Sequence, residues 1–153
     1  LYVQIRAQAL AVGVGLVDHR RIDEINILQA TYEAMRLALR RLASPAGALL
    51  TPQHLLLDAV RLPGESLPQT PIIHGDALSA SIAAASIIAK VTRDRLMVEM
   101  DGLYPGYGFA EHKGYSCRAH WDALRRLGPS PIHRLTFAGV AHPDVGGADH
   151  AAG

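Results

Sequence analysis

The chain has 153 residues, 49% of them hydrophobic, and a formal net charge of +1 at pH 7. This length fits one domain with a core of ordinary size, and the near-neutral charge excludes a surface that is basic throughout, so any nucleic-acid contact must be local. The single cysteine, Cys117, excludes an intrachain disulfide and favours a reducing, cytoplasmic location, and no apolar run reaches the ~20 residues of a membrane span.

The first part of the chain predicts a helix, a strand and a second helix. Residues 1–8 have the pattern of the end of an amphipathic helix, and the apolar run 9–17 is typical of a short buried strand. Asp18 is a suitable N-cap. The following residues, 21–43, place apolar side chains at helical spacing and therefore predict a long helix.

Two short strands, each followed by an acid, are predicted next. Residues 54–60 form an apolar strand with Asp58 near its end, residues 61–71 carry three prolines and predict a loop, and residues 72–74 predict a second strand before Asp76. Strands that alternate with helices favour an α/β fold, in which functional groups gather at strand ends. Carboxylates that converge there would suit a hard divalent cation such as Mg²⁺ or Mn²⁺.

The last part of the chain predicts two helices around an aromatic loop. A helix is expected over 79–101, with Ser79 as its cap, and a Gly- and Tyr-rich loop over 104–115. A helix with a glycine stop is expected over 117–128. Residues 141–153 predict a flexible tail.

Each candidate residue also has a structural explanation. Asp76 could be a turn or cap residue, and Asp58 could be an ordinary strand-end acid, although an acid after three leucines is difficult to bury without a partner or a metal. The aromatic loop could pack on its own core or could use an aromatic–cation surface to stack on sugars or bases. Its residues of interest are Tyr104, Tyr107, Phe109, His112, Lys113 and Tyr115.

Three other site types are not expected. His112, His120 and His133 lack the spacing of zinc ligands, and only one cysteine is available to join them. The Gly-x-Gly at 13–15 lies inside a predicted strand, whereas a dinucleotide fingerprint requires a strand-to-helix turn. Cys117 has no sequence context that identifies it as a catalytic nucleophile.

Five segments together resemble one known family. They occur in the order and spacing of bacterial ribonuclease HII, the type 2 ribonuclease H. The resemblance implies a ribonuclease H-like mixed sheet flanked by helices, over one domain of residues 1–140. The segments are IDEINILQAT (22–31), LLLDAVRLP (55–63), HGDALSASIAAASIIAKVTRDRLM (74–97), DGLYPGYGFAEHKGYS (101–116) and HRLTF (133–137).

The resemblance implies an endonuclease that hydrolyses the RNA strand of RNA/DNA hybrids. It would also cut 5′ to a ribonucleotide embedded in duplex DNA, leaving 3′-hydroxyl and 5′-phosphate ends. Four carboxylates of the family hold Mn²⁺ or Mg²⁺, and two of them match Asp58 and Asp76 here. Two such cations can activate a water and stabilise the leaving oxygen. We expect a monomer with no membrane association.

The resemblance also implies residues that contact the nucleic acid. Tyr115 matches the tyrosine that senses the RNA–DNA junction, where the 2′-hydroxyl distinguishes RNA from DNA. Lys113, Lys90 and Arg93 would contact phosphates. For Lys90 and Arg93, an equally good explanation is that they complement the C-terminal end of the helix dipole.

The chain departs from the family pattern in its N-terminal part. The family's DEAGRG-type segment is absent, and the only Asp-Glu pair, Asp23–Glu24, has no Gly-Arg-Gly after it. His74 stands where the family has a lysine. We therefore expect an N-terminally truncated chain that lacks the strands carrying two metal ligands and is impaired or inactive. One alternative is a non-catalytic module that binds RNA/DNA hybrids, and another is a small α/β protein with no nucleic-acid role.

Overall fold

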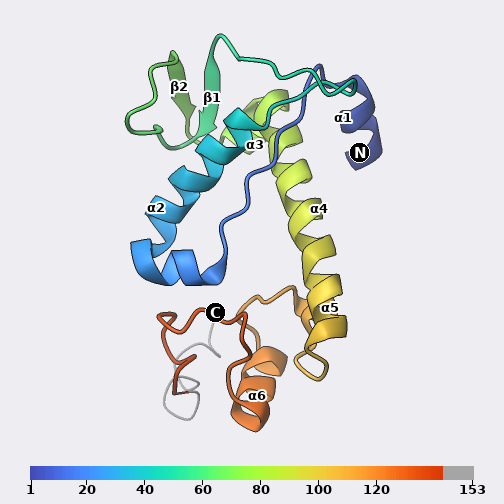
Figure 1. Cartoon of the computed structure of the whole chain (residues 1–153), viewed down its shortest axis with the longest axis vertical. Helices are drawn as coiled ribbons and strands as arrows, with labels where there is room; N and C mark the ends of the chain where they lie inside the picture. Colours follow the sequence, from blue (N-terminus) through green and yellow to red (C-terminus); the bar gives the residue numbers. More distant parts are fainter. Residues whose placement is uncertain (143–153) are drawn as a thin grey trace. The chain divides into compact units, whose positions relative to one another are not determined.

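The computed structural model describes residues 1–142, so the predicted tail at 141–153 lies almost wholly outside the described residues. Six helices and two strands form within residues 1–142 (Figure 1). In chain order they are α1 (Tyr2–Gln8), α2 (His19–Arg40), β1 (Leu55–Asp58), β2 (Gln69–Ile72), α3 (Gly75–Leu78), α4 (Ala80–Leu103), α5 (Phe109–His112) and α6 (Arg118–Leu127).

The chain divides into two compact units. Unit 1 comprises Leu1–Val17 and Ile27–Val91, and unit 2 comprises Asp18–Asn26 and the residues from Thr92 onward. Helices α2 and α4 each contribute residues to both units. The grouping of residues 1–140 as one domain stays a prediction.

Helix α2 begins as the sequence predicts but is broken inside. Oδ1 of Asp18 accepts a hydrogen bond from the backbone N–H of Arg21 at 2.9 Å, which is the geometry of an N-cap. Asn26 interrupts the helix with φ 69° and ψ 165°, a backbone conformation that is populated almost only by glycine. The uninterrupted helix predicted over 21–43 is therefore wrong at this point.

The apolar run 9–17 is extended but does not form the predicted strand. It makes one isolated antiparallel bridge, between Val12 and Ala43, and otherwise lies against helix α2. A Cβ atom on Gly13 or Gly15 would lie 2.1 Å or 1.9 Å from a backbone carbonyl oxygen of that helix. The two glycines therefore allow backbone to pack directly on backbone, and the run contacts a helix where a strand partner was expected.

The sheet of unit 1 has two parallel strands, β1 and β2, in a register from Leu55 with Gln69 to Asp58 with Ile72 (Figure 1). The strand at β1 was predicted. Strand β2 starts earlier than the predicted 72–74 and includes Pro71. In a sheet of two strands both strands are edges, and edge strands tolerate proline. Among residues 1–142 this sheet is parallel, so the mixed sheet stays an expectation from the family.

The loop between the strands is closed by the side chain of Gln69. Its Oε1 accepts from the backbone N–H of Leu62 at 2.8 Å, and its Nε2 donates to the Leu62 carbonyl at 3.0 Å. Leu62 is 2% exposed and is one of the best buried side chains of unit 1. The loop predicted from its prolines is thus fixed in one conformation, and it delivers the chain into β2.

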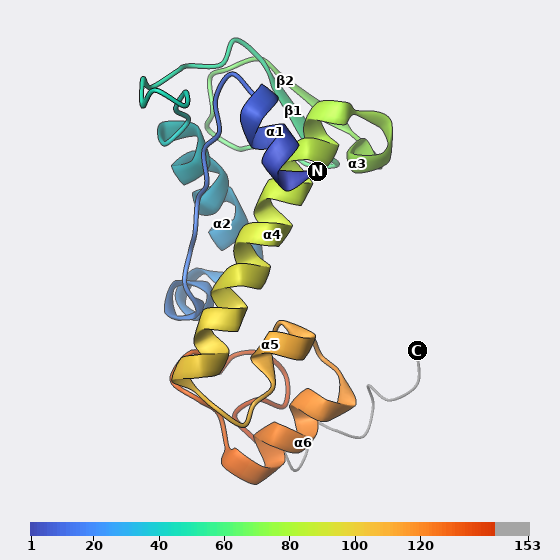
Figure 2. The same ribbon diagram turned by 90° about the vertical axis from the view of Figure 1, so that its right-hand side faces the viewer.

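Helix α4 agrees with the predicted helix at 79–101, but a short helix, α3, precedes it (Figure 2). The Oγ of Ser79 lies 3.5 Å from the backbone N of Ile82, a long contact for a cap. Strand β2 ends at Ile72, so most of the strand predicted at 72–74 is instead the turn that leads into α3 at Gly75.

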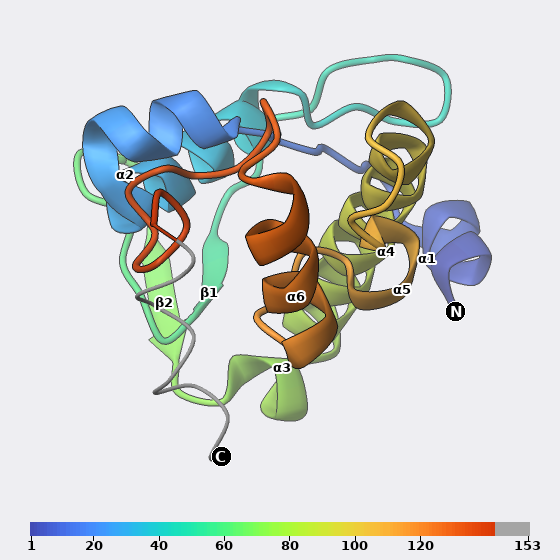
Figure 3. The same ribbon diagram turned by 90° about the horizontal axis from the view of Figure 1, so that it is seen from below.

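Unit 2 is built around α6 and the turns that follow it (Figure 3). Trp121, Leu124 and Val140 form a buried cluster, with Tyr107 packed against it. Helix α6 ends at Leu127 and is followed by Gly128, whose φ of 72° favours glycine, in agreement with the predicted glycine stop. The region predicted as an aromatic loop contains the short helix α5. Every helix of residues 1–142 lacks the combination of length and apolar character that a membrane crossing requires.

Candidate functional site

Two acids, Asp58 and Asp76, lie at the same end of the parallel sheet. Asp58 is the last residue of β1 and pairs with Ile72, the last residue of β2. Asp76 follows Ile72 by four residues and lies in the first turn of α3. The backbone N–H of Gly75 donates to Oδ1 of Asp58 at 2.9 Å. The carboxylate of Asp58 therefore contacts the residue immediately before Asp76.

This close approach depends on the turn between β2 and α3. His74 has a left-handed conformation with φ 55°, and Gly75 is buried. A Cβ atom on Gly75 would lie 2.6 Å from Cδ1 of Ile82 and 3.4 Å from Oδ1 of Asp58. Because position 75 has no side chain, the N–H group reaches Asp58 without displacing Ile82.

The two acids fit part of a metal centre. Both side chains are exposed, and a carboxylate has about four acceptor sites, so Asp58 keeps acceptor capacity besides its bond to Gly75. Carboxylate oxygens are the ligands that Mg²⁺ and Mn²⁺ prefer. No group of three His, Cys, Asp or Glu side chains that could hold a metal ion is found within the described residues. This part of the chain thus offers two candidate ligands at the sheet end.

The only Asp-Glu pair has a different environment. The carboxylate of Asp23 accepts hydrogen bonds from the backbone N–H of Leu135 at 2.8 Å and from both the N–H and the hydroxyl of Thr136, at 3.3 Å and 2.5 Å. The hydroxyl of Thr136 is the main cause that holds the pKa of Asp23 below its usual value. Glu24 pairs with Arg21 at 3.0 Å. Asp23 is therefore a clamp on the segment after α6.

A second set of candidate residues gathers around Tyr115 in unit 2. The Tyr115 side chain is 56% exposed, and the Cζ atom of Arg93 lies 4.3 Å from the centre of its ring. Nη2 of Arg93 also donates to the backbone carbonyl of Lys113 at 2.9 Å. Arg93 thus connects the ring of Tyr115 with the backbone two residues earlier.

The two lysines differ in their surroundings. The ammonium group of Lys113 donates to the carbonyl of Ala110 in its own loop. Lys90 is exposed on α4, three residues before Arg93. Of the basic residues considered, the structure places Arg93 and Lys113 beside Tyr115.

Three histidines, His112 of this loop together with His120 and His133, lie close to one another in unit 2. The rings of His112 and His120 stack with centroids 4.4 Å apart, and Nε2 of His120 lies 3.0 Å from Nε2 of His133. Burial is the main cause that lowers the pKa of His133 to about 4, and burial also lowers the pKa of His120. The only signal in the sequence was the occurrence of three histidines in and after an aromatic-rich segment.

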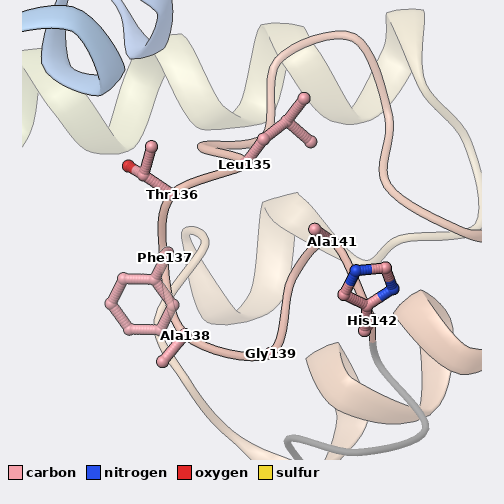
Figure 4. A pocket seen from close by; sticks show the side chains of 7 residues that line it. All are labelled: Leu135, Thr136, Phe137, Ala138, Gly139, Ala141 and His142. Atoms are coloured by element: carbon pink, nitrogen blue, oxygen red, sulfur yellow. The ribbon is translucent and has the colours of Figure 1, made fainter.

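Unit 2 also has two hollows. One lies where the chain bends between Thr136 and His142, with the limbs of the bend on either side (Figure 4). Among the described residues, His142 is the only titratable group that lines it. The other is lined by His19, Arg20, Asp23 and His133, among other residues.

Comparison with known proteins decides the family. The family model described as Ribonuclease HII matches residues 2–140. The chain belongs to the ribonuclease HII family. All five segments that carry the resemblance in the sequence lie inside the matched range.

Curated relatives of the family are closely similar in sequence. Ribonuclease HII of Lachnoclostridium phytofermentans is 59% identical over 137 residues, which cover 90% of this chain and 52% of that protein. Ribonuclease HII of Geobacter sulfurreducens is 57% identical over 140 residues, covering 92% of this chain and 62% of the relative. Ribonuclease HII of Geobacter metallireducens is 56% identical over 140 residues, which cover 92% of this chain and 63% of that protein. The chain therefore spans between about half and two thirds of the length of these relatives.

Proposed function

We propose that the chain acts in metal-dependent hydrolysis of RNA/DNA hybrids and in cleavage 5′ to a ribonucleotide embedded in duplex DNA. The observation that carries the proposal is the bond between Asp58 and Gly75, which holds one carboxylate beside the residue that precedes the other, Asp76. It occurs in a chain of the ribonuclease HII family.

Asp58 and Asp76 are the residues that would hold Mn²⁺ or Mg²⁺. A divalent cation bound there would supply an activated water and stabilise the leaving oxygen of the phosphodiester. The contribution of the protein is to fix the two ligands. Asp58 is oriented by the Gly75 N–H group, and Asp76 is placed on the first turn of α3 by the left-handed turn at His74.

Tyr115 is the residue that would recognise the ribonucleotide. Its exposed ring, backed by Arg93, can pack against a sugar, where the 2′-hydroxyl distinguishes RNA from DNA. Arg93 has five N–H donors, so it can contact a phosphate while it holds Lys113. Lys113 would reach a phosphate by exchanging its bond to the Ala110 carbonyl, and Lys90 would do so from the exposed side of α4.

One observation favours the alternative of a non-catalytic module that binds RNA/DNA hybrids. Within the described residues, two carboxylates lie at the end of the sheet. No set of three side chains that could hold a metal ion is found in this part of the chain. Binding would need the surface around Tyr115, whereas cleavage would also need a cation at Asp58 and Asp76.

Cleavage of a labelled DNA duplex that contains one ribonucleotide, with Mn²⁺ or Mg²⁺, tests the proposal. We expect a cut 5′ to the ribonucleotide that is lost in Asp58→Asn and in Asp76→Asn. The control is Asp122→Asn, which removes an exposed carboxylate that pairs with Arg118 and Arg125 on α6 and should leave cleavage unchanged.

Binding of the same duplex, measured by fluorescence anisotropy against an all-DNA duplex, separates the two functions. Selective binding that is lost in Tyr115→Ala, without cleavage, would establish the binding module and reject the nuclease. Absence of both cleavage and selective binding would reject both functions.

A further inference from the structure

His112, His120 and His133 form a connected group in unit 2. His112 belongs to α5, His120 to α6, and His133 follows α6. His120 and His133 are each 8% exposed, and the ring of Phe109 stands edge-on to His112 and His120. Buried imidazoles need a partner for each ring nitrogen, and here these partners are defined.

The partners of His133 fix which of its nitrogens carries the proton. The backbone N of Ser130 lies 2.9 Å from Nδ1 of His133, and a backbone N–H group can only donate. The hydroxyl of Ser130 lies 2.7 Å from the same nitrogen. Nδ1 therefore accepts, and a neutral His133 carries its proton on Nε2. That proton points to Nε2 of His120, 3.0 Å away.

The same reasoning fixes His120 in the opposite tautomer. Its Nε2 accepts from His133, so its proton is on Nδ1, and Nδ1 lies 3.1 Å from the backbone carbonyl oxygen of Tyr115. A carbonyl oxygen can only accept. The hydrogen bonds therefore run in one direction, from the Ser130 N–H through His133 and His120 to the Tyr115 carbonyl.

His112 fastens the other side of the same loop. Its Nδ1 accepts from the backbone N–H of Gly114 at 3.1 Å, and its Nε2 donates to the carbonyl of Tyr107 at 2.8 Å. Hydrogen bonds from imidazoles thus hold the loop at Tyr107, at Gly114 and at Tyr115. The ring of Tyr115 is held separately, by Arg93.

We propose that His133 and His120 are positioning residues for Tyr115, which fix its backbone carbonyl through a one-directional chain of hydrogen bonds that exists only while both imidazoles are neutral. The proposal deepens the proposed function and rests on it for the role of Tyr115 at the ribonucleotide. The geometry of this series of hydrogen bonds depends only on contacts within unit 2.

Protonation of either ring would replace one hydrogen bond of this series by a contact between two donors. A second proton on His133 would point Nδ1–H at the Ser130 N–H, and a second proton on His120 would point Nε2–H at the donor of His133. The titratable groups that face the pair are His112, His19 and Tyr107.

Two charged groups share a hollow with His133 and bear on its protonation. They are Arg20, a cation, and Asp23, whose carboxylate is turned to Leu135 and Thr136. Burial, followed by the neighbouring histidines, lowers the pKa of His133 to about 4. Burial is also the largest cause that lowers the pKa of His120. Both rings are therefore neutral at pH 7, and the series of hydrogen bonds is disrupted only when the pH is lowered.

The first test is a long-range ¹H–¹⁵N spectrum of the histidine side chains in the full chain at pH 7, without nucleic acid. The ring ¹⁵N shifts distinguish the two neutral tautomers and the cation. We expect His133 with its proton on Nε2 and His120 with its proton on Nδ1. The same tautomer for both, or a cation at either position, would overturn the proposal, and this measurement requires no variant.

The second test follows the backbone carbonyl and amide signals of Tyr115 as the pH is lowered. In the wild-type chain we expect them to stay unchanged until the pH approaches about 4. In His133→Asn the side chain is too short to reach His120, which loses its donor and can bind a proton on Nε2. The transition of Tyr115 should then move to a higher pH than in the wild type, because His120 no longer faces the Nε2–H group of His133.

The matched control is His54→Asn, because His54 contacts Thr70 in unit 1 and is outside the chain of hydrogen bonds. It should leave the Tyr115 transition where it is in the wild type. Equal transitions in wild type and His133→Asn would overturn the proposal. Binding to the ribonucleotide-containing duplex is measured separately at pH 7. Absence of this binding would reject the proposed function. The two spectroscopic tests would still decide the role of the histidines.

Discussion

The backbone N–H of Gly75 donates to Oδ1 of Asp58, and this bond connects residues 17 positions apart in the chain. Asp58 ends one strand and Gly75 follows the neighbouring one. The bond therefore fixes the end of the sheet at which both candidate metal ligands lie. The absence of a side chain at Gly75 leaves room for Ile82 beside this bond, and this gives the first prediction.

Gly75→Ala should destabilise unit 1 and displace Asp58. The new Cβ atom would lie 2.6 Å from Cδ1 of Ile82, so either that side chain or the turn must move. Overpacking of this kind costs about 1–3 kcal/mol. The measurement is the free energy of unfolding from denaturant titration, with Mn²⁺ binding as a second readout for the position of Asp58.

Gly102→Ala is the matched control. Gly102 lies in α4 with nothing within 4 Å of the position of a new Cβ atom, and alanine at a helix position is favoured over glycine by about 0.5–1 kcal/mol. The control should therefore be as stable as the wild type or more stable. If Gly75→Ala keeps wild-type stability and wild-type Mn²⁺ binding, the turn accommodates a side chain at position 75 and glycine is not required there.

Asp23→Asn should weaken the attachment of the segment after α6. The variant replaces a charged acceptor of three hydrogen bonds to Leu135 and Thr136 by a neutral amide, and we expect a loss on the order of 1 kcal/mol at pH 7. The check is denaturant unfolding of both chains.

The pH dependence of this loss has a defined sign. The pKa of Asp23 is lowered in the folded chain, mainly by the Thr136 hydroxyl. Its stabilisation is therefore complete above the pKa of the unfolded chain and disappears as the pH falls through the lower folded value. Asp23→Asn should lack this acid-dependent part. Glu24→Gln, which removes only the exposed pair with Arg21, should change stability little. An equal loss in both variants would contradict the role of Asp23 as a clamp.

The local pattern of the sequence predicted several elements correctly. The cap at Asp18, the strand that ends at Asp58, the long helix α4 and the glycine stop at Gly128 all appear where composition and spacing placed them. These features depend on residues near one another in the chain. The approach of Asp76 to the end of β1 also follows from two consecutive parallel strands, for which both acids come at the carboxyl end.

The missed features depend on contacts between distant residues. Asp23 bonds to Thr136, which is 113 positions away, and no local pattern indicates such a partner. The glycines at 13 and 15 look like part of a strand until helix α2 is known to lie against them. The turn after Gly128 brings His133 to His120, and His112 stacks on His120 from the preceding helix, so the spacing of the three histidines predicted neither their contacts nor their protonation.

Arg93→Lys should loosen the ring of Tyr115. A lysine ammonium cannot reproduce the planar contact of the guanidinium with an aromatic ring while also holding the Lys113 carbonyl. An exposed contact of this type is worth about 0.5–1 kcal/mol. We therefore expect affinity for the ribonucleotide-containing duplex to fall about two- to fivefold in anisotropy titrations.

Arg95→Lys provides the comparison, because Arg95 is an exposed residue on the same helix. Both variants keep the charge of the chain, so a difference between them reports the contact with Tyr115. If Arg93→Lys binds as tightly as Arg95→Lys and the wild type, the contact with Tyr115 contributes nothing and the charge of Arg93 is sufficient.

Unit 2 should lose stability as the pH falls from about 6.5 toward 4. An unfolded histidine binds a proton near pH 6.5, whereas the pKa of buried His133 is about 4 in the folded chain. Between these values the unfolded chain binds more protons, so its relative stability increases with acid. Above pH 6.5 the contribution of His133 is constant. Denaturant midpoints measured across this range should fall more steeply for the wild type than for His133→Asn, and parallel curves would contradict the burial of a neutral imidazole.

The central claim is that Asp58 and Asp76 hold a divalent cation at the end of the sheet, and Mn²⁺ binding followed by electron paramagnetic resonance tests it most directly. We predict that the chain binds Mn²⁺, that Asp58→Asn and Asp76→Asn each weaken binding by about tenfold, and that Asp122→Asn, on α6, does not. If both Asn variants bind Mn²⁺ as tightly as the wild type, or if the wild type binds none, the two carboxylates do not form a metal centre in this chain.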